Sequence, residues 1–231
     1  MAILDELKAK ANGAANKANN IQEAVSMMKL DDGAPGLKYV KDDPSDGGGV
    51  IEGDVNDNNA SGQYSHAEGY QTTASGNWTH AEGCGTVASG ENAHSEGAGT
   101  RATGGYSHAE GGGTLASGAQ SHAEGASTQA TGANSHAENL YTVASGACSH
   151  ASGSDTIAQR KSQFVIGEWN VADTSGETTG DRGDYAFIIG NGITDNDRSN
   201  AFAIKWDGTL VFGNGTEITP AQFAALLQSI S

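Results

Sequence analysis

The chain has 231 residues and a formal net charge of −16, with 28 acidic and 12 basic side chains. Glycine contributes 34 residues and aromatic residues only 6%, which is too little bulky apolar material for an ordinary two-layer core of this length. The charge argues against nucleic-acid binding, because phosphate would be repelled, and the sequence has no run of about 18 apolar residues that could form a membrane span.

Residues 1–30 carry a heptad pattern, in which apolar residues recur at alternating spacings of three and four. This seam consists of Leu4, Leu7, Ala11, Ala14, Ala18, Ile21, Val25 and Met28. We therefore expect an N-terminal coiled-coil helix, whose residue types alone do not choose between two and three strands. An ordinary amphipathic helix on a globular domain is the alternative.

Residues 31–48 are rich in Asp, Gly and Pro, which predicts an acidic, turn-rich linker. The segment Val50–Gly53 follows the linker and resembles a degenerate first repeat. It lies 16 residues before the next repeat, so we expect a bulge or a wider loop at that point.

Residues 49–167 repeat with a period of 14, and all seven histidines fall on that period. Glutamates follow two residues after most of the histidines. The resulting ladder contains His66, Glu68, His80, Glu82, His94, Glu96, His108, Glu110, His122, Glu124, His136, Glu138 and His150. A fixed short period predicts a solenoid. Fourteen residues suffice for two short strands ended by glycine turns, so successive coils should pair as parallel strands about 4.8 Å apart.

The alternation of side chains along a strand assigns the faces of this roll. Ser65 and Ala67 point to one face, while His66 and Glu68 point to the other. A two-stranded coil is flat, so we expect the small residues to line its interior. Burying one alanine methyl group per strand contributes under about 1 kcal/mol, whereas ordering each residue costs about 1–2 kcal/mol. We therefore expect an obligate homo-oligomer with part of the His/Glu face or of the variable face in the subunit contact.

The composition changes at residue 163, and all five phenylalanines lie beyond it. Phe164 and Ile166 occupy the histidine and glutamate positions of a further coil. We expect two more coils of this kind, so that residues 168–215 form a widened β cap with a hydrophobic cluster. The cluster consists of Phe164, Ile166, Phe187, Ile189, Phe202 and Ile204.

Residues 216–231 predict a short C-terminal helix, with Thr219 as N-cap and Pro220 in the first turn. Its apolar residues Phe223, Leu226 and Leu227 are expected to pack on one end of the oligomer or on a partner protein.

The combination of Ser, His and Glu raises the question of hydrolysis. Catalysis needs one organised site, not a column of equal sites, and adjacent strand residues such as Ser65 and His66 point to opposite faces. We therefore expect no enzymatic activity. The histidine column could bind metal if three-fold symmetry brought three imidazoles together, but hydrogen bonds from each histidine to a glutamate or a backbone carbonyl are the simpler explanation. We expect no cofactor.

The motifs Ser65-His66-Ala67-Glu68-Gly69 and Ser121-His122-Ala123-Glu124-Gly125 resemble the head repeats of YadA-type trimeric autotransporter adhesins. Their His- and Glu-bearing form is most similar to repeats in bacteriophage and prophage tail-fibre proteins. The resemblance implies an all-β fold with helical ends: a left-handed parallel β-roll, homotrimeric, with a neighbouring coiled coil.

The resemblance also implies a non-enzymatic trimeric fibre protein of a phage, prophage or tailocin that is structural and binds a host surface. A purely architectural virion part (head fibre, collar or baseplate connector) and a bacterial surface adhesin are the alternatives. Expected partners are two further copies of the chain, other virion proteins through a chain terminus, and a host receptor or glycan, with no nucleic acid or membrane. The N-terminus MAILDELKAK is charged where a signal peptide is apolar, so we expect synthesis in the host cytoplasm and localisation in the virion.

Overall fold

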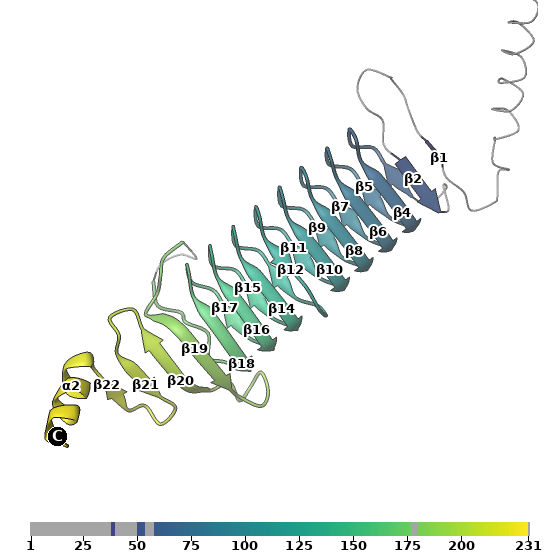
Figure 1. Ribbon diagram of the computed structural model, residues 1–231. Coiled ribbons are helices and arrows are strands. Elements are labelled where there is room, and N and C mark those ends of the chain that lie inside the picture. The colour runs from purple at the N-terminus through teal and green to yellow at the C-terminus, as the bar shows by residue number, and fades with distance from the viewer. Residues whose placement is uncertain (1–37, 40–49, 54–57, 177–179, 231) are drawn as a thin grey trace, which may run out of the picture.

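The computed structural model describes residues 38–39, 50–53, 58–176 and 180–230. This part of the chain is a β-solenoid of short parallel strands, followed by antiparallel strands and a C-terminal helix (Figure 1). The coiled-coil helix expected at residues 1–30, with its whole seam, lies outside the described residues, as does most of the expected linker.

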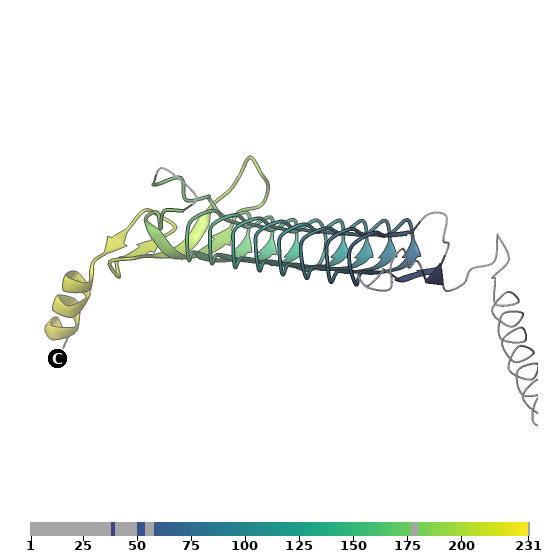
Figure 2. The same ribbon diagram turned by 90° about the horizontal axis from the view of Figure 1, so that it is seen from above.

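Each coil of the solenoid contributes one strand to each of two sheets. The longer sheet contains β2 (Val50–Gly53), β4 (His66–Tyr70), β6 (His80–Cys84), β8 (His94–Ala98), β10 (His108–Gly112), β12 (His122–Ala123), β14 (His136–Leu140), β16 (His150–Ser154) and β18 (Phe164–Glu168). The shorter sheet contains β3 (Asn59–Ala60), β5 (Thr73–Ala74), β7 (Val87–Ala88), β9 (Arg101–Ala102), β11 (Leu115–Ala116), β13 (Gln129–Ala130), β15 (Val143–Ala144) and β17 (Ile157–Ala158). Seen from above, the coils follow one another along the length of a rod (Figure 2).

Within the solenoid, from β2 to β18, the strands of both sheets pair in parallel, and their register follows the period of the sequence. His108 pairs with His94 on one side and with His122 on the other, while Ala116 pairs with Ala130. The predicted parallel roll of 14-residue coils is confirmed. At its beginning, Val50 of β2 pairs with His66 of β4, which confirms the first coil and its 16-residue spacing. A short strand not expected from the sequence, β1 (Lys38–Tyr39), pairs antiparallel with β2.

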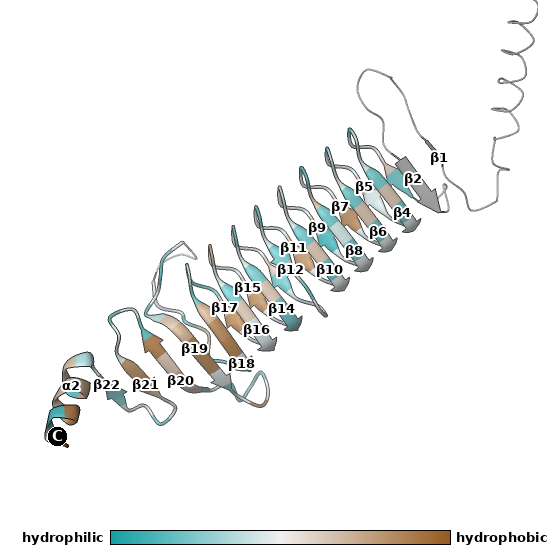
Figure 3. Ribbon diagram, viewed as in Figure 1, coloured by the Kyte–Doolittle hydropathy of each residue, from teal (hydrophilic) through white to brown (hydrophobic). Residues whose placement is uncertain are grey.

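The interior of the roll consists of small side chains, as the alternation predicts. Two alanine columns, which include Ala109 and Ala116, are fully buried, and so is the threonine column that includes Thr114. Some buried hydroxyl groups find acceptors within the coil, as Ser107 Oγ donates to the carbonyl oxygen of Gly104 at 2.7 Å. The hydroxyl of Thr114 has no hydrogen-bond partner among the described residues. Figure 3 shows the most hydrophobic strands gathered beyond this region, in β18 to β21.

Two corners of each coil use the left-handed backbone region. Gly97 has φ +105°, and a Cβ atom there would lie 2.2 Å from the carbonyl oxygen of Gly111. Glycine fits this position without a clash, and Asn139 takes the equivalent position in one other coil with φ 78°. At another corner, Trp78 and Tyr106 adopt φ values of 54° and 59°. The amide of Tyr106 donates to the carbonyl of Glu91 in the preceding coil at 2.7 Å, so the ladder of hydrogen bonds continues around the corner.

Buried asparagines occupy both ends of the shorter sheet. Asn58 accepts a hydrogen bond from the amide of Thr72 at 2.9 Å and donates to the carbonyl of Gly69 at 2.8 Å. At the other end, Asn170 accepts from the amide of Ile157 at 2.7 Å and donates to the carbonyl of the same residue at 3.1 Å. Asn170 takes the place of a backbone peptide beside the edge strand β17, whereas Asn58 joins the turn between Gly69 and Thr72 of the next coil.

The roll ends differently from the expectation. Strand β19 (Tyr185–Asn191) pairs parallel with β18, and Phe164 and Ile166 pair with Phe187 and Ile189. Strand β20 (Asn200–Lys205) then runs antiparallel to β19, so the expected third coil at Phe202 is wrong. The alternation of Phe202 and Ile204 is the same in either strand direction, and the chain between β19 and β20 reverses instead of completing a coil.

The remaining elements extend this antiparallel end. Strands β21 (Leu210–Phe212) and β22 (Glu217–Ile218) continue the meander. Helix α2 (Pro220–Ser229) follows, and Thr219 and Gln222 form a reciprocal capping box, which confirms the predicted N-cap. In the described part of the chain, no helix combines the length and apolar character needed to cross a bilayer.

Candidate functional site: the histidine and glutamate column

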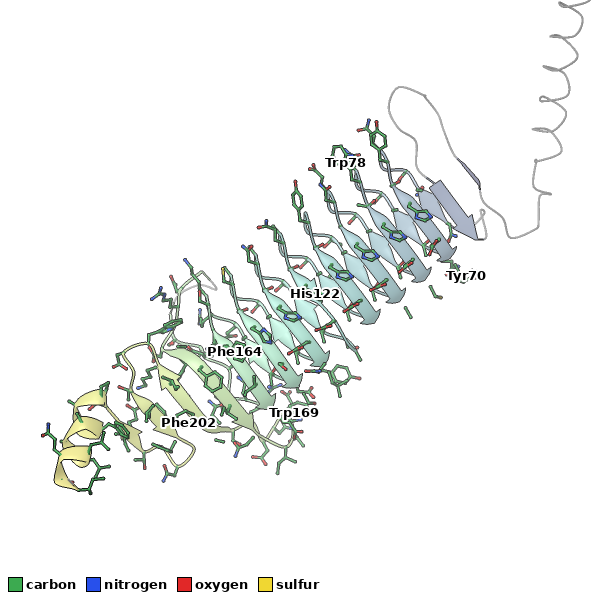
Figure 4. The ribbon with its side chains drawn as sticks, in the orientation of Figure 1. Tyr70, Trp78, His122, Phe164, Trp169 and Phe202 are labelled. Carbon is green, nitrogen blue, oxygen red and sulfur yellow. The ribbon has the colours of Figure 1, made fainter. Side chains whose placement is uncertain are left out.

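The seven histidines form one file along the outside of the longer sheet (Figure 4). From His66 to His136, neighbouring rings are nearly parallel and their centroids are 4.7–4.9 Å apart. His150 meets His136 edge to face at 4.8 Å. This spacing is that of adjacent strands, because the parallel register places each histidine directly over the one before it.

The aromatic file continues beyond the last histidine. Phe164 stacks on His150 with a centroid distance of 4.4 Å, and Phe187 lies 5.8 Å from Phe164. Phe164 is 41% exposed. Phe164 and Phe187 of the expected hydrophobic cap cluster therefore extend the outer column. The fully buried apolar residues of this region are their strand neighbours Val165 and Ile188.

The glutamates lie beside the imidazoles, mostly one coil earlier than the spacing of two residues suggests. His66 and His80 face the glutamates of their own coils, with Nε2–Oε2 distances of 3.6 and 3.9 Å. Each later histidine also approaches the glutamate twelve residues before it. These pairs are His94–Glu82 at 3.9 Å, His108–Glu96 at 3.5 Å, His122–Glu110 at 3.6 Å, and His136–Glu124 and His150–Glu138, both at 3.2 Å.

Only the last two of these pairs are hydrogen bonds. For His80, His94, His108 and His122, the Nε2 atom is shielded from solvent and has no hydrogen-bond partner among the described residues. Hydrogen bonds from histidine to glutamate within the described chain therefore join His136 to Glu124 and His150 to Glu138, at the C-terminal end of the ladder.

Two groups of the column have shifted pKa values. Burial lowers the pKa of His80 below its usual 6.5, and the neighbouring imidazoles of His94 and His66 lower it further. A hydrogen bond from Ser152 is the main cause that lowers the pKa of Glu138, with a further contribution from His150. Ser152 occupies the position that holds glutamate in earlier coils, so the last coil replaces a repelling charge with a donor.

The serines of the repeat do not meet the histidines. Ser65 is 2% exposed, and its hydroxyl donates to the carbonyl of Gly62 at 2.7 Å inside the roll. His66 and Glu68 lie on the outer face of the same strand. The predicted separation of Ser65 and His66 is confirmed, and this serine is not in contact with the column.

Exposed aromatic residues at one corner of the roll were not singled out from the sequence. Tyr64, Trp78 and Tyr106 are 56%, 49% and 63% exposed, and the rings of Tyr64 and Trp78 are parallel with centroids 6.3 Å apart. They occupy the left-handed corner position immediately before the serine or threonine of the motif. The 14-residue spacing could have identified this column, but its members vary in type and therefore resemble loop residues.

The C-terminal helix leaves an apolar surface uncovered. None of its residues is buried, and Phe223, Leu226 and Leu227 are each about half exposed. Phe223 and Leu227 join Leu210 and Ile218 in lining a shallow apolar pocket between the helix and the preceding strands.

Comparisons with known proteins give no relative from which a function could be transferred: no family model matches the sequence, and no curated protein is significantly similar to it.

Proposed function

We propose that the chain is a non-enzymatic fibre protein of a phage, prophage or tailocin, in which three copies of a left-handed roll stand side by side and bind a host surface. The proposal starts from the resemblance of the repeats to YadA-type heads and to phage fibres. The stiff parallel roll is compatible with it, although this fold alone is not specific to fibres.

The main support for a trimer is the continuous outer column, in which the histidine rings are followed by Phe164 and Phe187. Imidazoles spaced by one strand pass directly into the exposed ring of Phe164 and then to Phe187. An apolar column that lies in line with the histidine file and on the same face is typical of a surface covered by a partner. A second copy of the same chain presents the same period of 4.7–4.9 Å, so its rings and carboxylates can match this face coil by coil.

The small apolar area buried inside the roll also favours association of several chains. Its interior is filled by alanine, serine and threonine, which bury little apolar surface for each ordered residue. Covering the outer column with sibling chains supplies the missing burial at Phe164, Ile166 and Phe187. The exposed helix α2 offers Phe223, Leu226 and Leu227 to a sibling or to another virion protein.

The aromatic corner favours a binding role over a purely architectural one. Tyr and Trp are enriched at recognition surfaces because they combine large contact area with a polar group. Tyr64, Trp78 and Tyr106 lie in such a column at one corner of the roll. Three copies would present three columns, so weak contacts with a host receptor or glycan would multiply through effective concentration.

The decisive experiment determines where the protein lies on the native particle and whether it binds host cells. The protein carrying an N-terminal label is imaged by electron microscopy on the native particle, and the purified full chain is tested on host cells. A labelled fibre and saturable cell binding that weakens in Tyr64→Ser/Tyr106→Ser support the proposal. A labelled fibre without cell binding favours the architectural alternative, and a label on the bacterial surface instead of a particle favours the adhesin.

A further inference from the structure

We propose that the histidine column binds divalent transition-metal ions of the Zn²⁺ class, each held by an imidazole of one coil and by carboxylate or imidazole groups of the same and the adjacent coil. All ligands come from one chain, so the sites do not depend on the proposed function.

The donor atoms already converge in five places along the roll. Each group contains three side chains whose ligand atoms lie within 4.8 Å of one another. The groups are His66–Glu68–His80, Glu82–His94–Glu96, Glu96–His108–Glu110, Glu110–His122–Glu124 and Glu124–His136–Glu138. A mixed set of imidazole nitrogen and carboxylate oxygen suits zinc and its neighbours better than calcium or magnesium, which prefer oxygen alone.

The spacing of these atoms suits an intervening ion better than a direct hydrogen bond. Nε2 of His94 lies 3.9 Å from the carboxylate of Glu82, and Nε2 of His122 lies 3.6 Å from that of Glu110. Two metal–ligand bonds of about 2.1 Å meeting at a tetrahedral angle span about 3.4 Å. Small rotations of these glutamate side chains, which are 31% and 33% exposed, close the difference, whereas the present distances are too long for hydrogen bonds.

Histidine nitrogens without a hydrogen-bond partner also support metal binding. Nε2 of His94, His108 and His122 is shielded from solvent and has no hydrogen-bond partner among the described residues, although each faces a carboxylate. A buried polar atom without a partner is costly, and in native proteins such atoms usually meet a water or an ion. A metal ion would satisfy these nitrogens and both neighbouring carboxylates together.

The charge of the column provides the driving force. Six glutamates lie in one file, and neutral histidines do not compensate them. Lysine and arginine are absent from the histidine and glutamate positions of the repeats. Cations that lie between the coils remove this repulsion, and three divalent ions balance six carboxylates.

Neighbouring groups share glutamate ligands, and this sharing also limits the number of ions per chain to three. The groups centred on Glu68, His94 and His122 have no residue in common. The group of His108 shares both of its glutamates with neighbouring groups, and the group of His136 shares Glu124. No more than three of the five groups can therefore be filled without two ions sharing a residue. We expect up to three ions per chain.

The test uses the untagged full chain, stripped with a chelator and then exposed to Zn²⁺. Metal content after removal of free ions is measured by plasma mass spectrometry, and titration calorimetry compares Zn²⁺ with Mg²⁺. The proposal expects about three zinc ions per chain and at least a hundredfold weaker binding of Mg²⁺. Failure to retain zinc, or equal binding of the two metals, would overturn it, and neither result would affect the fibre proposal.

A matched pair of variants locates the sites. Glu96→Gln/Glu110→Gln breaks the three central groups and leaves two intact, so zinc should fall from three ions to two. Glu91→Gln/Glu168→Gln removes the same charge from exposed positions outside the column and should retain three. Equal zinc content in both variants would show that zinc binds elsewhere and would contradict the proposal. Circular dichroism of each variant checks that the roll has folded.

Discussion

The rings of His150 and Phe164 stack with centroids 4.4 Å apart, so the outer column passes from imidazole to phenyl without a break. The same strand register that stacks the histidines places Phe164 next in line. The polar repeats and the apolar end of the roll therefore share one continuous face, and that face is where the proposed subunit contact lies.

The variant Phe164→Ser/Phe187→Ser tests this contact. Removing two large apolar groups from a covered surface costs about 2–4 kcal/mol for each chain, so the concentration needed for trimer formation should rise at least tenfold. Sedimentation at several protein concentrations measures the change. Tyr141→Ser removes an aromatic side chain that is 55% exposed at a corner, and it should leave the association unchanged.

Gly97 and Gly99 lie at the same corner of one coil, and substituting each of them tests whether the close approach of successive coils requires glycine. Gly97→Ala places a Cβ atom 2.2 Å from the carbonyl of Gly111 in the next coil, so it should destabilise the fold by about 3 kcal/mol or more. Gly99 also has a positive φ, of 67°, but no atom lies within 4 Å of its added Cβ. Gly99→Asn should cost less than about 1 kcal/mol, because asparagine tolerates this conformation.

The measurement for both glycine variants is chemical denaturation of the folded assembly at a fixed protein concentration. Equal losses for Gly97→Ala and Gly99→Asn would mean that the close approach of the coils is not what requires glycine at position 97.

Asn170 closes the end of the shorter sheet, and Asn170→Leu tests that role. The substitution leaves the amide and the carbonyl of Ile157 without the partners that the side chain provides. Because both groups are partly buried, the loss should be about 2–3 kcal/mol. Gln129→Leu, at an exposed outward position of β13, is the control and should change the unfolding free energy by less than about 0.5 kcal/mol. Hydrogen exchange at the Ile157 amide should accelerate only in the Asn170 variant.

The pH dependence follows from the shifted pKa values. The pKa of His80 is lowered on folding, so the unfolded chain binds more protons and stability falls as the pH drops below 6.5 towards the folded pKa. The pKa of Glu138 is also lowered, so its contribution is present above its usual 4.5 and is lost at lower pH. Both groups therefore make the fold less stable in acid.

Melting temperatures at about pH 8 and about pH 5 in metal-free buffer measure the contribution of His80, and the melting temperature should be lower at pH 5. His80→Phe removes the titrating group and keeps a ring in the stack, as Phe164 does after His150. The difference between the two pH values should shrink in this variant. An identical melting temperature at both pH values in the unaltered protein would contradict the account of the column.

The sequence predicts the roll well because its period and its alternation are set by local geometry. A histidine every 14 residues defines the register, and only small residues such as Ala109 fit the narrow interior. The same reasoning identifies the start of α2, because Thr219 and Pro220 are specific signals for a helix N-terminus.

Other features depend on contacts between coils or on chain direction, which a one-dimensional pattern does not contain. The pattern of Phe202 and Ile204 reads alike forwards and backwards, so the antiparallel direction of β20 was not predicted. The approach of His94 to Glu82 of the preceding coil depends on side-chain rotamers. The left-handed corner at Trp78 and Tyr106 holds several types of side chain in other coils, such as Asn92 and Cys148, so no single residue type marks it.

The mass of the folded protein in solution tests the central claim most directly. Light scattering coupled to size-exclusion chromatography of the intact chain should give three times the 23.4 kDa of one chain, with the circular dichroism of a β-rich protein. A folded species of 23.4 kDa that remains single across concentrations would contradict the account, because the small-residue roll would then be stable without the covering of its outer column.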